Sequence, residues 1–185
     1  MAKGTKDRMI AAAVRLLATR GLQGASLADI LELANAPRGS VYHHFPGGKD
    51  ELITAAVELA GRRSLEQLDG FDGRPPADVA ERFFASWREL LVRTQYRSGC
   101  SVLAVTVAAD SPELLDRSAH TFDVWQRRLA DLFEHGGLSR EAAKTYATTL
   151  IAVSEGAVVM CRAQRSTAPL DSVAQQFVTQ LRSAG

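Results

Sequence analysis

An all-α fold is predicted for this 185-residue chain, with three short N-terminal helices joined by a fourth helix to a C-terminal helical bundle. Apolar residues recur at helical spacing along almost the whole chain, and capping residues, prolines and glycines mark where the helices begin and end. One stretch, SVLAVTVAA from Ser101 to Ala109, is rich enough in β-branched residues for a strand. Because it has no second strand to pair with, we expect a helix there as well.

Caps and turn residues predict the first helices in turn. Thr5 is the expected cap of the first helix. Ser26, with Asp29 three residues later, has the spacing of a capping box and starts a second, short helix. Asn35 tolerates a positive φ and ends that helix, and Pro37 is expected to set the first turn of a third. Two short helices should therefore meet across a tight turn.

The third helix is contained in PRGSVYHHF, residues 37–45. Val41 and Phe45 are four residues apart, so they should face the core together. The polar face should then consist of Arg38, Gly39, Ser40, Tyr42, His43 and His44. An amphipathic helix, a tight turn and an exposed second helix of this composition describe a helix-turn-helix element that reads DNA.

The side chains of this face suit a duplex. Arg38 can pair with a guanine or a phosphate, and the neighbouring hydroxyl and imidazole groups can donate to phosphate oxygens or base edges. Gly39 has no side chain to keep the backbone away from DNA. Lys49 lies at the expected start of the fourth helix, where a helix N-terminus already favours a phosphate.

Charge is distributed unevenly along the chain. The net charge is only +1, but residues 1–50 carry seven basic and four acidic side chains, whereas the remainder carries fifteen and seventeen. A basic N-terminal part is what a protein that binds a polyanion needs. An ordinary solvated surface could show the same small asymmetry.

Later breakers and caps predict the body of the protein. The fourth helix should run from about residue 48 to 68 and end at GFDGRPP, residues 70–76. Further helices are expected from Pro76, from Pro112 to the glycines after His135, from Ser139 to about Arg165, and from Pro169.

Other functions have weaker support. Adjacent histidines point to different faces of a helix, so His43 and His44 are not expected to share a metal, and no metal or other cofactor is predicted.

Cys100 could act as a nucleophile with His120 or His135 as its base, but it lies in an apolar stretch. The sequence also has no glycine-rich phosphate loop, HExxH or GxSxG motif. We predict no enzyme.

A helical adaptor that binds another protein through the same N-terminal module is the alternative to DNA binding. Salt dependence distinguishes DNA binding from protein binding: duplex binding should weaken steeply with added salt, whereas a hydrophobic protein contact should not.

The expected compartment is the cytoplasm. Two cysteines without paired spacing favour a reducing environment. Arg15 and Arg20 interrupt any export-signal-like apolar run, and the longest apolar stretch is shorter than the ~20 residues that span a bilayer, so no membrane contact is expected.

Residues 5–53 resemble the TetR family of transcriptional regulators, through AAAVRLLATRGLQGASL, ILELANAPRGSVYHHF and KDEL. The resemblance implies a DNA-binding domain over residues 1–53 and a ligand-binding and dimerisation domain over residues 54–185. It implies DNA contacts at Ser26, Arg38, Gly39, Ser40, Tyr42, His43, His44 and Lys49. Pro37 departs from the serine or threonine usual there. The PGG before Lys49 is one residue longer than the common form, and PGGK with GCSVLAV resembles the LmrA/YxaF-like branch.

The resemblance also implies a homodimer joined through its last two helices, a palindromic DNA operator, and a repressor released by a small apolar or aromatic ligand. The helix ending near Arg165 is apolar on more than one face, which fits either this interface or the centre of a monomeric bundle. Residues that could line a ligand cavity, or simply form packed core, are Phe84, Trp87, Leu91, Phe122, Trp125 and Met160.

Overall fold

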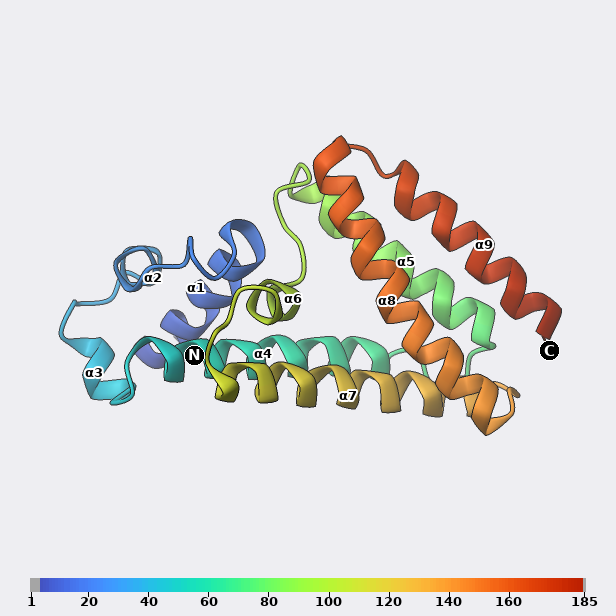
Figure 1. The fold of residues 1–185 in the computed structure, drawn as a ribbon, viewed down its shortest axis with the longest axis horizontal. Helices are drawn as coiled ribbons and strands as arrows, with labels where there is room; N and C mark the ends of the chain where they lie inside the picture. The colour runs from blue at the N-terminus through green and yellow to red at the C-terminus, as the bar shows by residue number, and fades with distance from the viewer. Residues whose placement is uncertain (1–3, 185) are drawn as a thin grey trace. The chain divides into compact units, whose positions relative to one another are not determined.

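The computed structural model describes residues 4–184, which form nine α-helices and no strand (Figure 1). The predicted all-α fold is confirmed, including a helix at the start of SVLAVTVAA. The helices are α1 Thr5–Arg20, α2 Leu27–Ala34, α3 Ser40–His44, α4 Lys49–Asp69, α5 Pro76–Arg93, α6 Ser101–Thr106, α7 Pro112–His135, α8 Arg140–Gln164 and α9 Ala168–Ala184.

Packing divides the chain into two compact units. Unit 1 contains the residues up to Arg63 together with Cys100–Phe122, and unit 2 contains Ser64–Gly99 and the residues from Asp123 onward. Both α4 and α7 contribute residues to each unit. The predicted DNA-binding domain falls within unit 1, apart from residues 1–3, which lie outside the described residues. The functional boundary at residue 53 stays a prediction.

Unit 1 is built around α1, which packs against α2 and α6. Its core contains Met9, Leu17, Ile30, Val41, Phe45, Leu52, Ile53, Val102 and Val105. The unit 1 parts of α4 and α7 approach closely at Gly61, where a Cβ would lie 3.0 Å from Thr121 Cγ2. An ion pair of 3.2 Å between Arg117 and Glu58 joins the same two helices.

The caps of α2 are as predicted. The Ser26 hydroxyl oxygen accepts a hydrogen bond from the Asp29 backbone N–H at 3.1 Å, and Asn35 ends the helix in the left-handed conformation, with φ 48°. The cap of α1 was wrongly predicted, because Thr5 is the first helical residue and Gly4 is the N-cap, without a side-chain hydrogen bond.

The start of α3 also differs from the prediction. Pro37 does not begin the helix, which starts three residues later at Ser40. The carbonyl oxygen of Pro37 accepts hydrogen bonds from the Ser40 backbone N–H at 3.0 Å and from its hydroxyl at 2.6 Å. These bonds close a turn over Arg38 and Gly39. Gly39 already has helical backbone angles, with φ −71° and ψ −13°, but α3 itself covers only five residues.

Unit 2 is a bundle in which α9 packs against both α5 and α8. Phe177 of α9 lies edge-on to Phe84 of α5 and to Tyr146 of α8, with ring centroids 5.9 and 5.7 Å apart. The ion pair between Arg88 and Asp171, 3.2 Å, also connects α5 with α9. None of the helices within residues 4–184 is long and apolar enough to cross a membrane.

Candidate nucleic-acid interface

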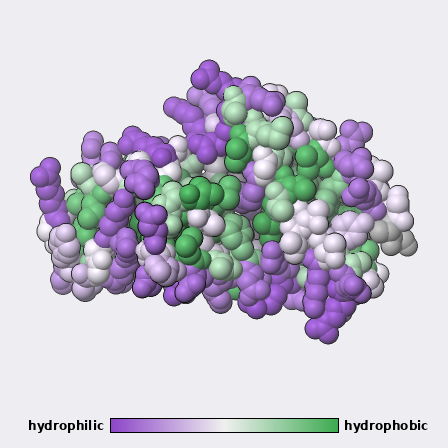
Figure 2. Space-filling view, viewed as in Figure 1, coloured by the Kyte–Doolittle hydropathy of each residue, from purple (hydrophilic) through white to green (hydrophobic). Residues whose placement is uncertain are grey.

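α3 has one buried and one exposed face. Val41 and Phe45 are each 1% exposed, whereas the side chain of Tyr42 is 66% exposed. Arg38, Gly39 and His43 are exposed as well, and Ser40 and His44 are half-buried. The surface over α3, at the left of Figure 2, is mostly purple and white, which marks polar and neutral residues. The predicted orientation of this helix is confirmed, and contact with DNA stays a prediction.

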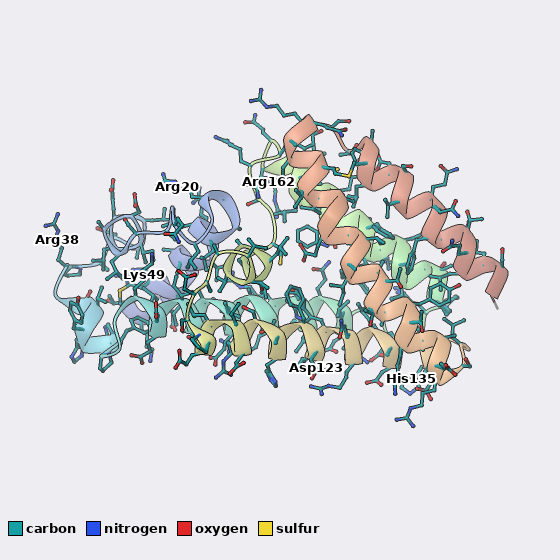
Figure 3. The ribbon with its side chains drawn as sticks, viewed as in Figure 1. Arg20, Arg38, Lys49, Asp123, His135 and Arg162 are labelled. Atoms are coloured by element: carbon teal, nitrogen blue, oxygen red, sulfur yellow. The ribbon has the colours of Figure 1, made fainter. Side chains whose placement is uncertain are left out.

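Arg38 is the most prominent cation of this surface. Figure 3 shows it projecting from the turn before α3, away from the rest of unit 1. Within the part of the chain that the structure describes, its guanidinium forms no ion pair or hydrogen bond. All five of its N–H donors are therefore open to an acceptor outside the chain.

Gly39 leaves the backbone uncovered at the same turn. A Cβ built there would meet nothing within 4 Å, and its φ of −71° suits any residue. The fold of unit 1 therefore does not itself require glycine at this position, which is consistent with the predicted close approach of DNA.

The Ser40 hydroxyl is already used inside the chain. Because it donates to the Pro37 carbonyl oxygen, only its oxygen lone pairs remain for an external donor. The predicted role of Ser40 as a phosphate donor therefore requires this hydrogen bond to break.

Ser26, at the N-terminus of α2, lies beside a carboxylate of the chain. Its hydroxyl donates to the Asp29 carboxylate, which also pairs with Arg20 at 3.1 Å. The Ser26 hydrogen bond, together with Arg20, holds the pKa of Asp29 below its ordinary value. A DNA phosphate at Ser26 would therefore share the helix N-terminus with a negative charge, which opposes it.

Lys49 is held at the start of α4. Its Nζ donates to the Leu22 carbonyl oxygen at 3.4 Å. The additional residue in the preceding turn is accommodated by Gly48, whose φ is 73°. Glu51 accepts a hydrogen bond from the Gly47 backbone N–H at 2.8 Å, so a carboxylate of the chain already occupies one amide near this helix end.

Arg8 is a contributor that the sequence did not single out. Its guanidinium donates to the carbonyl oxygens of Ala34 and Asn35, which end α2. A basic residue on an amphipathic helix usually points to solvent. The partners of Arg8 instead lie 26 and 27 residues away in the chain. Apart from the basic character of residues 1–50, no pattern in the sequence marks this contact.

Cys100, considered above as a nucleophile, has a structural role, and the second cysteine, Cys161, is buried. The Cys100 Sγ accepts a hydrogen bond from the Leu103 backbone N–H at 3.4 Å and caps α6. Burial raises the pKa of the Cys161 thiol, which makes it less reactive at neutral pH. Over residues 4–184, no group of three or more His, Cys, Asp or Glu side chains is placed to hold a metal ion.

The six residues suggested for a ligand cavity differ in how deeply they are buried and in the unit to which they belong. Phe84, Leu91 and Trp125 are buried in unit 2, and Trp87 is half-buried there. Phe122 belongs to unit 1. Met160 is 51% exposed and therefore does not lie in the interior of its unit.

Known proteins share this arrangement. Residues 9–56 match the family described as bacterial regulatory proteins, tetR family, and residues 76–176 match the C-terminal domain of LmrA/YxaF-like transcriptional regulators. An HTH-type transcriptional regulator of Mycobacterium tuberculosis is 31% identical over 182 residues, which cover 95% of this chain and 93% of the relative. LmrA of Bacillus subtilis, an HTH-type transcriptional regulator, is 28% identical over 90% of each chain. The crystal structure of regulatory protein TetR from Rhodobacter sphaeroides has a TM-score of 0.85 at 26% identity, covering 95% of this chain and 97% of that one.

Proposed function

The chain belongs to the TetR family of bacterial transcriptional regulators, and we propose that it is a homodimeric repressor that binds a palindromic operator and leaves it when a small ligand binds. DNA binding and regulation of transcription follow from the family. The repressor activity, the symmetry of the operator and the release by a ligand are our proposal. We also propose that the protein acts in the cytoplasm, without catalysis.

The exposed face of α3 is the observation that carries the proposal. Val41 and Phe45 anchor the helix in the core, so Tyr42 and His43 face outward beside Arg38. A short helix held in this way can enter the major groove, where base edges are read by hydrogen bonds.

The surface of α8 supports a dimer. Between Thr145 and Cys161 the sequence contains one charged residue, Glu155, and this side chain is only 9% exposed. The exposed residues of this stretch are Thr145, Thr148, Thr149, Ala152, Gly156, Val159 and Met160. Figure 2 shows largely white and green surface along α8. Depletion of charge is typical of the centre of a protein interface, whereas a solvated helix face usually carries charges.

Gly156 adds a second argument for this interface. Glycine in a helix interior costs ~1 kcal/mol relative to alanine. A Cβ at Gly156 would meet nothing within 4 Å, so no neighbour in the described chain requires a glycine there. The close approach of a helix from a second copy would provide the reason. We therefore propose that α8 pairs across a two-fold axis together with α9, whose exposed residues include Ser172, Gln175, Gln176, Thr179 and Gln180.

The dimer provides the symmetry that the operator needs. One five-residue helix contacts few bases, whereas two copies held about one duplex turn apart, ~34 to 36 Å, read a palindrome. A small apolar or aromatic ligand in the body would release DNA only to the extent that it binds the released conformation more tightly. Phe84, Trp87, Leu91 and Trp125 remain the proposed contacts in unit 2.

Selection of bound duplexes from a random pool tests the proposal. We expect enrichment of a palindrome whose half-sites are one turn apart, and affinity that falls steeply with added salt. Enrichment of no sequence, or binding that is insensitive to salt, would contradict operator recognition and favour a protein adaptor. A thermal-shift screen with aromatic and lipophilic compounds then identifies ligands. Compounds that raise the melting temperature should release the selected operator.

A further inference from the structure

The beginning of α1 holds the segment that contains α3. We propose that Arg8 is the positioning residue that fixes residues 34–45, here called the recognition segment, in the geometry that an operator requires. This inference rests on the proposed contact between α3 and DNA. It assigns to Arg8 a role inside the protein rather than at a phosphate.

The contacts of the Arg8 guanidinium include three oxygens of the described residues. Its Nε donates to the Ala34 carbonyl oxygen at 3.0 Å. Its Nη2 lies 3.4 Å from the Asn35 carbonyl oxygen and 3.4 Å from Thr5 Oγ1. Ala34 is the last residue of α2 and Asn35 is its left-handed cap. One side chain of α1 therefore binds both the end of α2 and the turn that leads to α3.

Physical chemistry favours arginine at this point. The last carbonyl groups of a helix have no partner within the helix, and a positive charge is stabilising at this end. The planar guanidinium presents several donors in a fixed fork, so it can bind two neighbouring carbonyl groups at once. A backbone hydrogen bond of 3.0 Å from Ala36 N–H to the Leu31 carbonyl oxygen closes the same turn.

Two neighbours of Arg8 contact the rest of the recognition segment. The Lys6 Nζ lies 5.3 Å from the centroid of the Phe45 ring, a cation–π distance. The Ser40 hydroxyl lies 4.0 Å from Met9 Sδ. The start, the middle and the end of the recognition segment are thus each in contact with the first two turns of α1.

A helix as short as α3 depends on such anchors. Five residues cannot offset the cost of starting a helix, so its position must come from tertiary contacts. Val41 and Phe45 hold one face of α3 in the core, while Arg8 determines where the preceding turn lies relative to α1. Removing Arg8 should therefore loosen the turn and lower the fraction of molecules in which α3 fits the groove.

The experiment compares full-length wild-type protein with Arg8→Met, which keeps an apolar stem but removes the donors. Arg15→Met is the matched control, because Arg15 is an exposed arginine of the same helix and its variant loses the same charge. Each protein is titrated with the selected operator and with an unrelated duplex over a series of salt concentrations. The melting temperature and the oligomeric state are measured alongside.

We expect Arg8→Met to lose about tenfold in operator affinity, the size of effect typical of hydrogen bonds to a charged group. The slope of log affinity against log salt should stay that of the wild type, since no phosphate contact is removed. A slope reduced by about 1, with operator and unrelated duplex weakened equally, would identify Arg8 as a phosphate contact and overturn the proposal. Wild-type operator affinity in Arg8→Met would overturn it too.

Hydrogen exchange supplies a readout that a general loss of stability would not reproduce. In Arg8→Met the amides of residues 35–45 should exchange faster, while those of α5, α8 and α9 keep wild-type rates. Uniformly faster exchange in every helix would overturn a positioning role. Arg15→Met should leave both regions unchanged.

Arg8→Lys keeps the test valid if Arg8→Met does not fold. Lysine retains the charge but offers a single ammonium in place of a fork, so we expect a folded protein with about threefold weaker operator binding. Operator affinity equal to the wild type in Arg8→Lys would refute the need for the fork. A failure of the proposed function differs from all these results, because then the wild-type protein selects no operator.

Discussion

The side-chain ammonium of Lys49 donates to the carbonyl oxygen of Leu22 at 3.4 Å, so the first residue of α4 is tied to the turn that follows α1. An ammonium has three donors, and this bond uses one. We predict that Lys49→Met weakens binding to operator and unrelated duplex by the same factor and lowers the salt slope by about 1. Titrations at several salt concentrations measure both. A lower melting temperature with an unchanged slope would mean that Lys49 serves the turn alone.

Arg38 should affect recognition of particular bases, unlike Lys49, because it projects from the turn without an intramolecular partner in the described chain. If it reads a base, Arg38→Ala should cost ~1 to 3 kcal/mol of operator affinity. The loss should be confined to particular base pairs of the half-site, and dimerisation should stay intact. Binding assays with single-base operator variants measure it. Normal operator binding by this variant would remove Arg38 from the proposed contacts.

Gly39→Ala separates folding from DNA binding. The φ of −71° suits alanine and nothing lies within 4 Å of the new Cβ, so the free energy of unfolding should rise by ~0.4 to 1 kcal/mol. Operator affinity should fall because the methyl group would separate the backbone from the duplex. Gly24→Ala is the contrast, since its Cβ would lie 2.6 Å from the Arg20 carbonyl oxygen and should destabilise the fold. Undiminished operator binding by Gly39→Ala would exclude close approach at this turn.

The Asp29 carboxylate should stabilise the fold at neutral pH and lose this effect in acid. The hydrogen bond from Ser26, aided by Arg20, lowers the pKa of Asp29 in the folded protein from an ordinary value of about 3.9. A group with a lowered pKa stabilises the fold above its unfolded pKa, and this stabilisation is lost as the pH falls through the folded value. The melting temperature of wild type should therefore exceed that of Asp29→Asn at neutral pH, and the difference should shrink below about pH 4. Thermal denaturation between pH 7 and pH 3 measures it, and a constant difference would contradict the assignment.

Gly156→Leu tests the dimer. The space around Gly156 within the chain is open, so the variant should fold with little change. In a close helix pair the added side chain should weaken dimerisation by about tenfold or more, since overpacking typically costs ~1 to 3 kcal/mol. Sedimentation equilibrium gives the dimer dissociation constant. The control is Glu32→Leu, which adds the same side chain at an exposed position of α2. Equal dimerisation in both variants would place the interface elsewhere.

Local chemistry accounts for what the sequence predicted correctly. The Ser26 cap, the left-handed Asn35 and the inward pair Val41 and Phe45 each depend on neighbours within a few residues. Such features follow from capping geometry and helical periodicity, so they are readable without knowledge of the tertiary fold. The family resemblance added the identity of the element, which the comparisons confirm.

Contacts distant in sequence account for what was missed. Arg8 and Lys49 bind carbonyl oxygens 26 and 27 residues away, and a carbonyl group leaves no mark in the sequence. The late start of α3 has a local origin instead: the Ser40 backbone N–H and hydroxyl both bind the Pro37 carbonyl oxygen three residues earlier, and proline propensity does not reveal these bonds. Glu51 is a short-range contact of another kind, since it accepts from the Gly47 backbone N–H four residues earlier, one residue more than the spacing of a capping box.

The brevity of α3 limits how its binding preference can be engineered. A five-residue helix does not keep its conformation outside the protein that anchors it. A synthetic peptide of residues 37–45 should therefore be a random coil in water. Exchanging this stretch with that of a relative should transfer operator choice only when the recipient also supplies matching anchors for both its ends. Grafting α1 through α3 as one block is therefore the sound route to a regulator with a new target.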